Sequence, residues 1–417
     1  MKAERRDGKK ILLVGVLILC FCIKTGIISA KSARGVTDNS VKVGAIFDLT
    51  GPLATIIKPI VEAMRNYTRY TNDQGGINGR KIKLIIEDDR YSIPASISAF
   101  KKLIYRDKIF ALLGPGSTGE TRVLLDQMMK LKLPSIPMAA DRELIEPYKR
   151  YIFLSIDTYF TELGVLYDYM IEISKPKRPR ITLALVDAGV KAVAIRETNF
   201  WERFLNVDID VVLIPVNVLD TTSEVLNIKQ NKVDFVIVGH SIPTVALFLR
   251  DSKKFGLKAK IFTSYSGTSE DVIKLAPNAV SNYYGIHPFS SWYDDSPGME
   301  KLRKITLAYH PGTEKPYRGK NYSLGWVMTK ILYEGINRAG KDLDNERLVD
   351  SLETFRNYNT QGICGPITYS SVSHEGLKYV KVFKANVETG QLDAITDWRR
   401  APIVEKSEAP SISKVEK

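Results

Sequence analysis

The sequence predicts an α/β protein built as two doubly wound lobes. Short β-rich runs alternate with segments of helical periodicity, which is typical of parallel sheets covered by helices. This alternation completes one set of strands and helices and then restarts near residue 181. With 417 residues, the chain exceeds what one ordinary hydrophobic core holds and suits two domains.

The first set of elements begins with a strand from Val41 to Phe47 and a loop at Gly51-Pro52. The helix that follows is expected to hold Pro59 in its first turn and to bury one face. That face carries Ile60, Met64, Tyr67 and Thr71. The rest of the set comprises strands at 81–87, 110–114 and 133–137 and helices at 93–106 and 118–131.

The second set repeats this pattern. Its strands are expected at 181–186, 209–214, 234–238 and 260–263, and its helices at 191–205, 222–231, 243–255 and 268–276. Two such sets in one chain predict two doubly wound lobes. A further strand is expected from Tyr283 to Ile286, and the polar tail at 403–417 lacks an apolar period and is expected to fray.

The segment from Asn72 to Asp89 predicts the end of a helix, a tight turn and a strand. Its three glycines allow the backbone to turn, and Asn78 tolerates a left-handed conformation. Asp88 and Asp89 follow one another on a strand, so their side chains point to opposite faces. We therefore favour loop hydrogen bonding and solvent exposure for them over a metal site or an acid/base pair.

The first 30 residues have the pattern of a secretory leader. Basic residues precede an apolar run from Ile11 to Ile23, which is shorter than the roughly 20 residues of a membrane span. Ala30 offers a small residue at a cleavage site. We expect cleavage after Ala30 and a periplasmic or other extracytoplasmic location. The alternatives are an uncleaved anchor and lipidation at Cys20 or Cys22.

The net charge of +13 is dispersed along the chain, and six basic and two acidic residues of the leader account for four of these charges. No block of Lys and Arg is interleaved with aromatic residues. This pattern predicts a solvated surface rather than binding to nucleic acid.

Residues that could carry catalysis are sparse. Cys364 is the only cysteine beyond the leader, so we expect no intramolecular disulfide, and the apolar Ile363 before it favours a buried thiol. The histidines lack metal-ligand spacing; they are His240, His287, His310 and His374. We therefore expect that the protein is not an enzyme and that it binds neither a metal ion nor a cofactor.

Motifs in one order cover most of the chain from Val41 to Trp398. They are Val41-Lys-Val-Gly, Thr50-Gly51-Pro52, Asn72 to Asp89, Leu113-Gly114 with Ser117-Thr118 and Asp126, Ala184-Leu-Val-Asp187, Asp234-Phe-Val-Ile-Val-Gly239, Phe255-Gly256-Leu257 and Gly365-Pro366-Ile367. Together they resemble the leucine/isoleucine/valine-binding protein family, which comprises periplasmic receptors of ABC transporters.

The resemblance implies a type I periplasmic binding fold, a Venus-flytrap in which two lobes joined by three crossings close on a small ligand. We expect lobe one at 41–158 plus 287–375 and lobe two at 159–286 plus 376–402, with a hinge at His287-Pro288. The implied function is capture of a small organic ligand for the permease subunits of an ABC transporter. The alternative is an extracytoplasmic sensor that acts with a separate signalling partner.

Ligand binding is expected at the helix N-terminus that follows the third strand. Free N–H groups and the helix dipole attract an anion there. The resemblance implies that Thr118, with the neighbouring amides of Ser117 and Gly119, holds a ligand carboxylate. An ordinary N-cap role for Thr118 is the alternative. The segment matches neither a Walker loop nor a nucleophile elbow.

Other positions depart from the family pattern. The family's second head-group hydroxyl falls at Ala140, and its ammonium-binding carboxylate falls at Ser266, beside Tyr265. Where the family has aromatic residues that cover the ligand, this chain has Ile56, Lys191 and Ser241. Where the family has the two cysteines of a disulfide, it has Ser92 and Ser117.

These departures bear on the ligand, because burying an ammonium without a carboxylate partner costs on the order of several kcal/mol. We therefore expect a related organic acid or amide rather than an ordinary α-amino acid. If Lys191 faces the cleft, it would hold the acid group together with Thr118; otherwise it is a surface residue of its helix. Ile56 and the segment Met138-Ala139-Ala140 would contact the apolar body of the ligand.

Overall fold

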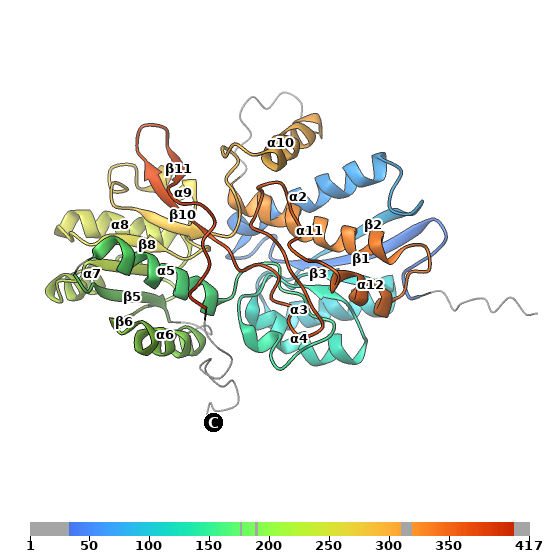
Figure 1. The fold of residues 1–417 in the computed structure, drawn as a ribbon, viewed down its shortest axis with the longest axis horizontal. Coiled ribbons are helices and arrows are strands. Elements are labelled where there is room, and N and C mark those ends of the chain that lie inside the picture. The colour runs from blue at the N-terminus through green and yellow to red at the C-terminus, as the bar shows by residue number, and fades with distance from the viewer. Residues whose placement is uncertain (1–32, 176, 188–190, 310–318, 404–417) are drawn as a thin grey trace, which may run out of the picture.

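The computed structural model describes residues 33–175, 177–187, 191–309 and 319–403 (Figure 1). The expected leader, the tail beyond residue 403 and His310 lie outside these ranges. Within them the chain forms parallel sheets flanked by helices, which confirms the predicted α/β class. No helix in the described ranges combines the length and the apolar character that a membrane span requires.

The first sheet contains four parallel strands in the order β2-β1-β3-β4. They are β1 (Ser40–Phe47), β2 (Lys81–Asp88), β3 (Ala111–Leu113) and β4 (Ser135–Ile136). The connecting helices are α2 (Ala54–Asp73), α3 (Ile93–Lys101), which continues into the π-helical turn η1 (Lys102–Asp107), and α4 (Thr118–Lys130). The short 3-10 turn η2 (Arg142–Leu144) follows β4. Each predicted strand and helix of this set is confirmed, with ends that shift by a few residues.

The start of α2 differs from the prediction. The helix begins at Ala54, so Pro59 lies in the second turn rather than the first. The carboxylate of Asp48 accepts hydrogen bonds from the backbone N–H groups of Gly51 and Leu53. These bonds hold the loop in a helix-leading conformation and extend α2 upstream of the proline.

The turn from α2 to β2 forms as predicted. Gly76 has φ +86°, and a Cβ there would lie 2.1 Å from the Arg80 carbonyl oxygen, so only glycine fits. The Asn72 side chain then joins the end of the helix to the strand. Its Nδ2 donates to the Ile82 carbonyl at 2.9 Å, and its Oδ1 accepts from the Ile82 amide at 2.7 Å.

The second sheet repeats the topology of the first, with four parallel strands in the order β6-β5-β7-β8. They are β5 (Arg180–Val186), β6 (Asp208–Ile214), β7 (Phe235–Gly239) and β8 (Lys260–Thr263). Its helices are α5 (Tyr159–Ser174), α6 (Lys191–Leu205), α7 (Thr222–Gln230), α8 (Ile242–Phe255) and α9 (Glu270–Leu275). Figure 1 shows this group beside the first, and its predicted elements are confirmed.

The C-terminal part of the chain contributes to both groups. An antiparallel sheet of order β11-β10-β9 continues the second sheet through a bridge between Ile261 and Tyr283. Its strands are β9 (Tyr284–His287), β10 (Lys381–Asn386) and β11 (Gln391–Ala394). The helices α10 (Pro297–Tyr309), α11 (Lys320–Ala339) and α12 (Asn345–Leu352) lie with the first group. Helix α11 approaches α2 so closely that a Cβ at Gly325 would lie 2.1 Å from the Ile60 carbonyl oxygen.

The Cys364 thiol is buried, as predicted. Burial raises its pKa to about 12, and the thiol lies 3.3 Å from the Thr360 hydroxyl. A thiol of this kind behaves as a small apolar side chain rather than as a nucleophile.

Candidate functional site

The N-terminus of α4 follows the carboxyl end of β3. Ser117 is its N-cap: the hydroxyl accepts the Glu120 amide at 3.2 Å and donates to Glu120 Oε2 at 2.8 Å. The cap role considered for Thr118 therefore belongs to Ser117, because the helix begins one residue later. Gly119, in the first turn, is exposed.

The Thr118 side chain joins three segments of the chain. Its Oγ1 accepts the Ala140 amide at 3.2 Å, and it shares a side-chain hydrogen bond with Tyr159. Tyr159, the first residue of α5, donates its own amide to the Ala140 carbonyl at 2.8 Å. The structure thus brings Thr118 and Ala140 together and adds Tyr159; their roles in ligand binding stay predictions. Met138 and Ala139, which precede Ala140 in the sequence, are also buried.

Tyr265, which follows β8, lies at the same place. Its amide donates to Glu162 Oε1 at 2.8 Å. Burial raises the pKa of its phenol, and nearby Tyr159, Glu162, Asp157 and Tyr91 raise it further. Residues from both sheets and from the connection before α5 therefore converge around the Tyr265 ring.

The other predicted site residues have different contacts. Lys191 Nζ lies 3.4 Å from Asp187 Oδ1, and the lysine side chain is 40% exposed. The Ser266 hydroxyl lies 2.8 Å from the Ser264 hydroxyl. The Ser241 hydroxyl lies 3.3 Å from that of Thr244, and Ile56 belongs to the main hydrophobic core. Roles in ligand binding for Lys191, Ser241, Ser266 and Ile56 stay predictions.

Buried carboxyl groups are the feature that sequence reasoning missed. Asp157 is 1% exposed, and within the described chain neither of its carboxylate oxygens has a hydrogen-bond partner. Burial raises its pKa well above the usual range, and Glu162 and Glu375 raise it further. Burial also raises the pKa of Glu162, to about 7. No local pattern marked either residue, because their burial depends on chain segments that are distant in sequence.

A second pair of carboxyl groups lies near the start of α4. Burial and the neighbouring Asp89 together raise the pKa of Glu120 to about 8. Asp89 is 0% exposed, so the solvent exposure expected for it is wrong; it is buried against Glu120. For Asp88 the expected loop hydrogen bonding is confirmed, since its carboxylate accepts the Leu49 amide at 2.9 Å and the Thr50 hydroxyl at 2.6 Å.

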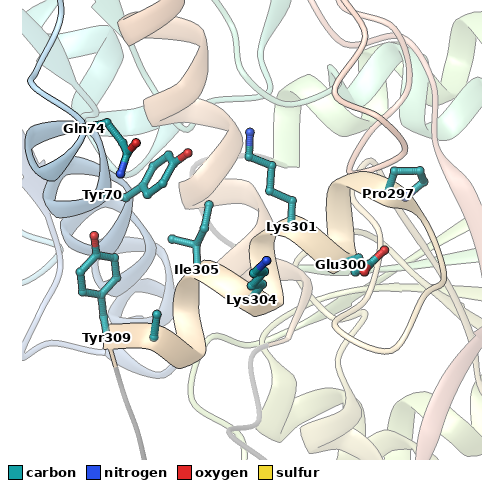
Figure 2. A pocket seen from close by; sticks show the side chains of 9 residues that line it. Tyr70, Gln74, Pro297, Glu300, Lys301, Lys304, Ile305 and Tyr309 are labelled. Carbon is teal, nitrogen blue, oxygen red and sulfur yellow. The ribbon is translucent and has the colours of Figure 1, made fainter.

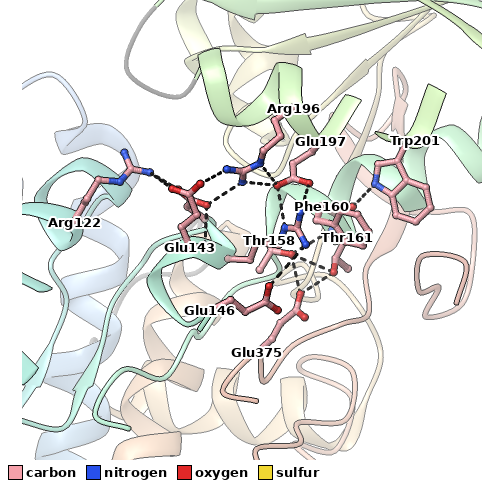
Figure 3. A network of polar contacts seen from close by, with 12 residues as sticks. Arg122, Glu143, Glu146, Thr158, Phe160, Thr161, Arg196, Glu197, Trp201 and Glu375 are labelled. Atoms are coloured by element: carbon pink, nitrogen blue, oxygen red, sulfur yellow. Dashed lines mark hydrogen bonds and ion pairs between the residues drawn. The ribbon is translucent and has the colours of Figure 1, made fainter. Parts of the chain in front are cut away.

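An ion-pair network lies beside this region and joins the segment after β4 to helix α6 (Figure 3). Arg142 donates to the two carboxylate oxygens of Glu197 at 3.0 and 3.1 Å, and both side chains are buried. Arg196 contacts Glu143 and Glu197. The paired groups satisfy one another's charge, so this network holds the two segments together rather than offering a free charge to a ligand.

An open groove with a volume of about 600 Å³ lies elsewhere, between the end of α2 and α10 (Figure 2). Its lining residues are Tyr70, Gln74, Pro297, Glu300, Lys301, Lys304, Ile305, Ala308 and Tyr309. Neither Thr118 nor Tyr265 lines it, so it is separate from the candidate site. In the described ranges, no group of three or more His, Cys, Asp or Glu side chains is arranged to hold a metal ion.

Comparison with known proteins places this geometry in context. Residues 40–391 match the family model described as periplasmic binding protein. The leucine-specific-binding protein of Salmonella typhimurium is 20% identical over 333 residues, which cover 80% of this chain and 89% of that protein. The Leu/Ile/Val-binding protein homolog 7 of Brucella melitensis biotype 1 is 22% identical over 325 residues, which cover 72% and 77% of the two chains.

Solved structures share the fold. A branched-chain amino acid ABC transporter protein from Thermus thermophilus, with bound valine, superimposes with a TM-score of 0.79 at 23% identity and covers 88% of this chain and 97% of its own. A fatty acid ABC transporter substrate-binding protein from Thermomonospora curvata superimposes with a TM-score of 0.78 at 19% identity and covers 89% and 97%. The fold is therefore shared by proteins whose names state chemically different ligands.

Proposed function

Because the chain belongs to the periplasmic binding protein family, whose members are substrate-binding proteins of transporters and not enzymes, we propose that it captures a small organic ligand between two lobes and delivers it to an ABC permease. The convergence of Thr118, Tyr159 and Tyr265 carries the proposal. These residues come from the start of α4, the start of α5 and the end of β8, and they meet where both sheets present the carboxyl ends of their strands. Ligands of open α/β sheets bind at such ends.

The proposed lobes are 41–158 plus 287–375 and 159–286 plus 376–402. Contacts between two of the crossings support this division. The Leu154 amide donates to the His374 carbonyl at 3.0 Å, and the Thr158 hydroxyl donates to Glu375 Oε1 at 2.8 Å. Neighbouring crossings of this kind form a hinge about which two lobes can rotate. The third crossing follows β9 at His287-Pro288, where the histidine side chain is buried.

Export by the leader at residues 1–30 belongs to the same proposal, because a receptor for an external solute must act outside the cytoplasm. The ligand is proposed to be a small organic molecule other than an ordinary α-amino acid. Ser266 supports this choice, since a hydroxyl replaces the expected carboxylate. Titration calorimetry with leucine tests it directly, and tight leucine binding would contradict it.

Capture and closure are tested on the purified mature chain. Native mass spectrometry is expected to show a bound small molecule, and small-angle scattering to show compaction when the ligand-free protein is saturated with it. Thr118→Val removes the hydroxyl that joins three segments and is expected to weaken binding. Thr389→Val, in the exposed turn between β10 and β11, is the matched control. A scattering profile that saturating ligand leaves unchanged would refute the closing receptor.

A further inference from the structure

We infer that the ligand is an organic cation without a carboxylate group, and that Asp157 and Glu162 bind its positive charge. This inference rests on the proposed function, since it concerns the same cleft. It differs from the organic acid that the sequence favoured.

Asp157 is the first support. The side chain is 1% exposed, and within the described residues neither carboxylate oxygen has a hydrogen-bond partner on another residue; the backbone amide of Asp157 itself lies near enough to lower its pKa. Folded proteins pair almost all buried polar groups, because an unpaired one loses its hydration without compensation. Asp157 lies two residues before Tyr159 and interacts electrostatically with Tyr265, so it belongs to the convergence described above. A ligand that donates hydrogen bonds would complete this carboxyl group.

Glu162 is the second support. It is 2% exposed and accepts the Tyr265 amide through Oε1. Asp157 lies close enough to Glu162 that the Glu162 carboxylate raises the pKa of Asp157 beyond the effect of burial. The electrostatic neighbours found for Asp157 in the described residues are the carboxyl groups of Glu162 and Glu375, with no basic side chain among them. A positively charged ligand would relieve this repulsion.

Three tyrosines form the third support. Tyr265 interacts electrostatically with both carboxyl groups, Tyr159 interacts with Glu162, and Tyr91 interacts with the other two tyrosines. Aromatic faces attract cations, and phenol oxygens accept hydrogen bonds from ammonium groups. Carboxyl groups surrounded by tyrosine rings therefore suit an amine or a related organic cation.

The start of α4 argues against a ligand carboxylate. The helix dipole would attract an anion there, but Glu120 occupies the first turn and Asp89 lies against it. Asp89 and Glu120 share a side-chain hydrogen bond, and burial raises the pKa of both. Burial raises the pKa of Tyr91, and the carboxyl groups of Glu120 and Asp48 raise it further, so the acidic character of this region extends to Tyr91. A ligand carboxylate at the start of α4 would therefore lie near two buried carboxyl groups.

Lys191 and Lys378 already have carboxylate partners. Lys191 pairs with Asp187 at 3.4 Å, and Lys378 pairs with Glu375 at 3.6 Å. Glu375 also accepts hydrogen bonds from Thr158 and Thr161 at 2.8 Å each. These contacts leave Asp157 and Glu162 as the carboxyl groups that a ligand cation would reach.

The test compares ligands of matched shape and different charge. Each primary amine of a panel is paired with the carboxylic acid and the α-amino acid of the same side-chain skeleton, for example 3-methylbutylamine with 4-methylpentanoate and leucine. Binding is measured by calorimetry on the mature chain, together with the mass and charge of any molecule that the purified protein releases on denaturation. We expect the amine of a set, or a released cation, to bind at least about 30-fold more tightly than its acid.

Two variants assign the charge to its residues. Asp157→Asn and Glu162→Gln keep the side-chain shape and are expected to weaken amine binding at least about 30-fold, while circular dichroism shows a folded chain. Asp208→Asn, whose carboxylate is 77% exposed and pairs with Arg178 at 3.2 Å, is the control and is expected to bind normally. Normal amine binding by both cleft variants would overturn the assignment.

The number of protons released or taken up on ligand binding provides an independent test of the inference. Burial raises the pKa of Asp157 and Glu162, and a bound cation favours their ionised forms, so amine binding is expected to release protons to the buffer. Calorimetry in two buffers of different ionisation enthalpy measures this release. Proton uptake, or an acid or zwitterion as the tightest ligand, would refute the cation inference alone. A chain that binds no panel member and releases no small molecule would refute the proposed function as well.

Discussion

Replacing Glu120 with Gln is expected to stabilise the protein at neutral and alkaline pH. The Glu120 side chain is 3% exposed, and burial, together with Asp89, raises its pKa from 4.5 to about 8. The folded state therefore holds a proton that the unfolded chain releases above pH 4.5. Stability falls as the pH rises from 4.5 to about 8 and then stays constant with respect to this group.

The size of the effect follows from the two pKa values. The cost attributable to Glu120 is about 1 kcal/mol at pH 5, about 3 kcal/mol at pH 7 and about 5 kcal/mol at pH 9. A glutamine cannot ionise. Its Oε1 can still accept from the Ser117 hydroxyl, as Glu120 Oε2 does at 2.8 Å, and its amide can donate to Asp89. The variant is expected to gain about 4 kcal/mol over the wild type between pH 5 and pH 9.

Urea unfolding of both proteins at pH 5, 7 and 9 measures this difference. Glu346→Gln is the control with the opposite sign. Hydrogen bonding from Tyr151, followed by Arg150 and Lys132, lowers the Glu346 pKa to about 2, so its stabilising effect is present above pH 4.5 and is lost as the pH falls towards 2. Because this side chain is 40% exposed, the loss at pH 7 is expected to stay within about 1 kcal/mol. A difference between Glu120→Gln and wild type that does not change with pH would refute the reasoning.

Three further predictions concern other buried groups. Glu197→Gln removes the carboxylate that pairs with the buried Arg142 at 3.0 Å. It is expected to lower the free energy of unfolding, measured in urea, by about 3 kcal/mol. Unchanged stability would show that the network contributes little. Lys320→Met removes the cation that pairs with Glu270 at 3.0 Å, where the two side chains are 1% and 2% exposed, and a similar loss is expected; Glu270→Leu in the same chain should recover part of it, and a double variant no more stable than the single one would contradict this. Cys364, whose pKa burial raises to about 12, is expected to react with a thiol reagent at pH 8 only in denaturant, and fast reaction of the native chain would show that the thiol is accessible.

Local pattern was sufficient for most of the elements. The predicted strand at 260–263 and the predicted helix at 191–205 have the observed bounds of β8 and α6, because β-branched runs and helical periodicity act within a few residues of the chain. The turn at Gly76 also follows from local backbone geometry. The start of α2 did not follow, because the Asp48 carboxylate, outside the helix, directs it through hydrogen bonds to Gly51 and Leu53.

The candidate site divides in the same way. Sequence motifs predicted the neighbourhood of Thr118 and Ala140, which a hydrogen bond of 3.2 Å joins. They did not predict Asp157 or Glu162. Carboxyl groups are common in solvated segments, and the residues next to Asp157 and Glu162 in the sequence do not indicate that these two side chains are buried.

The sequence by itself determined the fold class, the order of the elements and the family, because these depend on periodicity and on motifs read along the chain. Only the tertiary structure decided which charges meet. It places Tyr265, more than 100 residues away in sequence, against Glu162 and excludes water from Asp157. Desolvation depends on all the segments that pack around a group. The electrostatic character of the candidate site, and with it the ligand that we propose, therefore follows from the packed chain and not from any one motif.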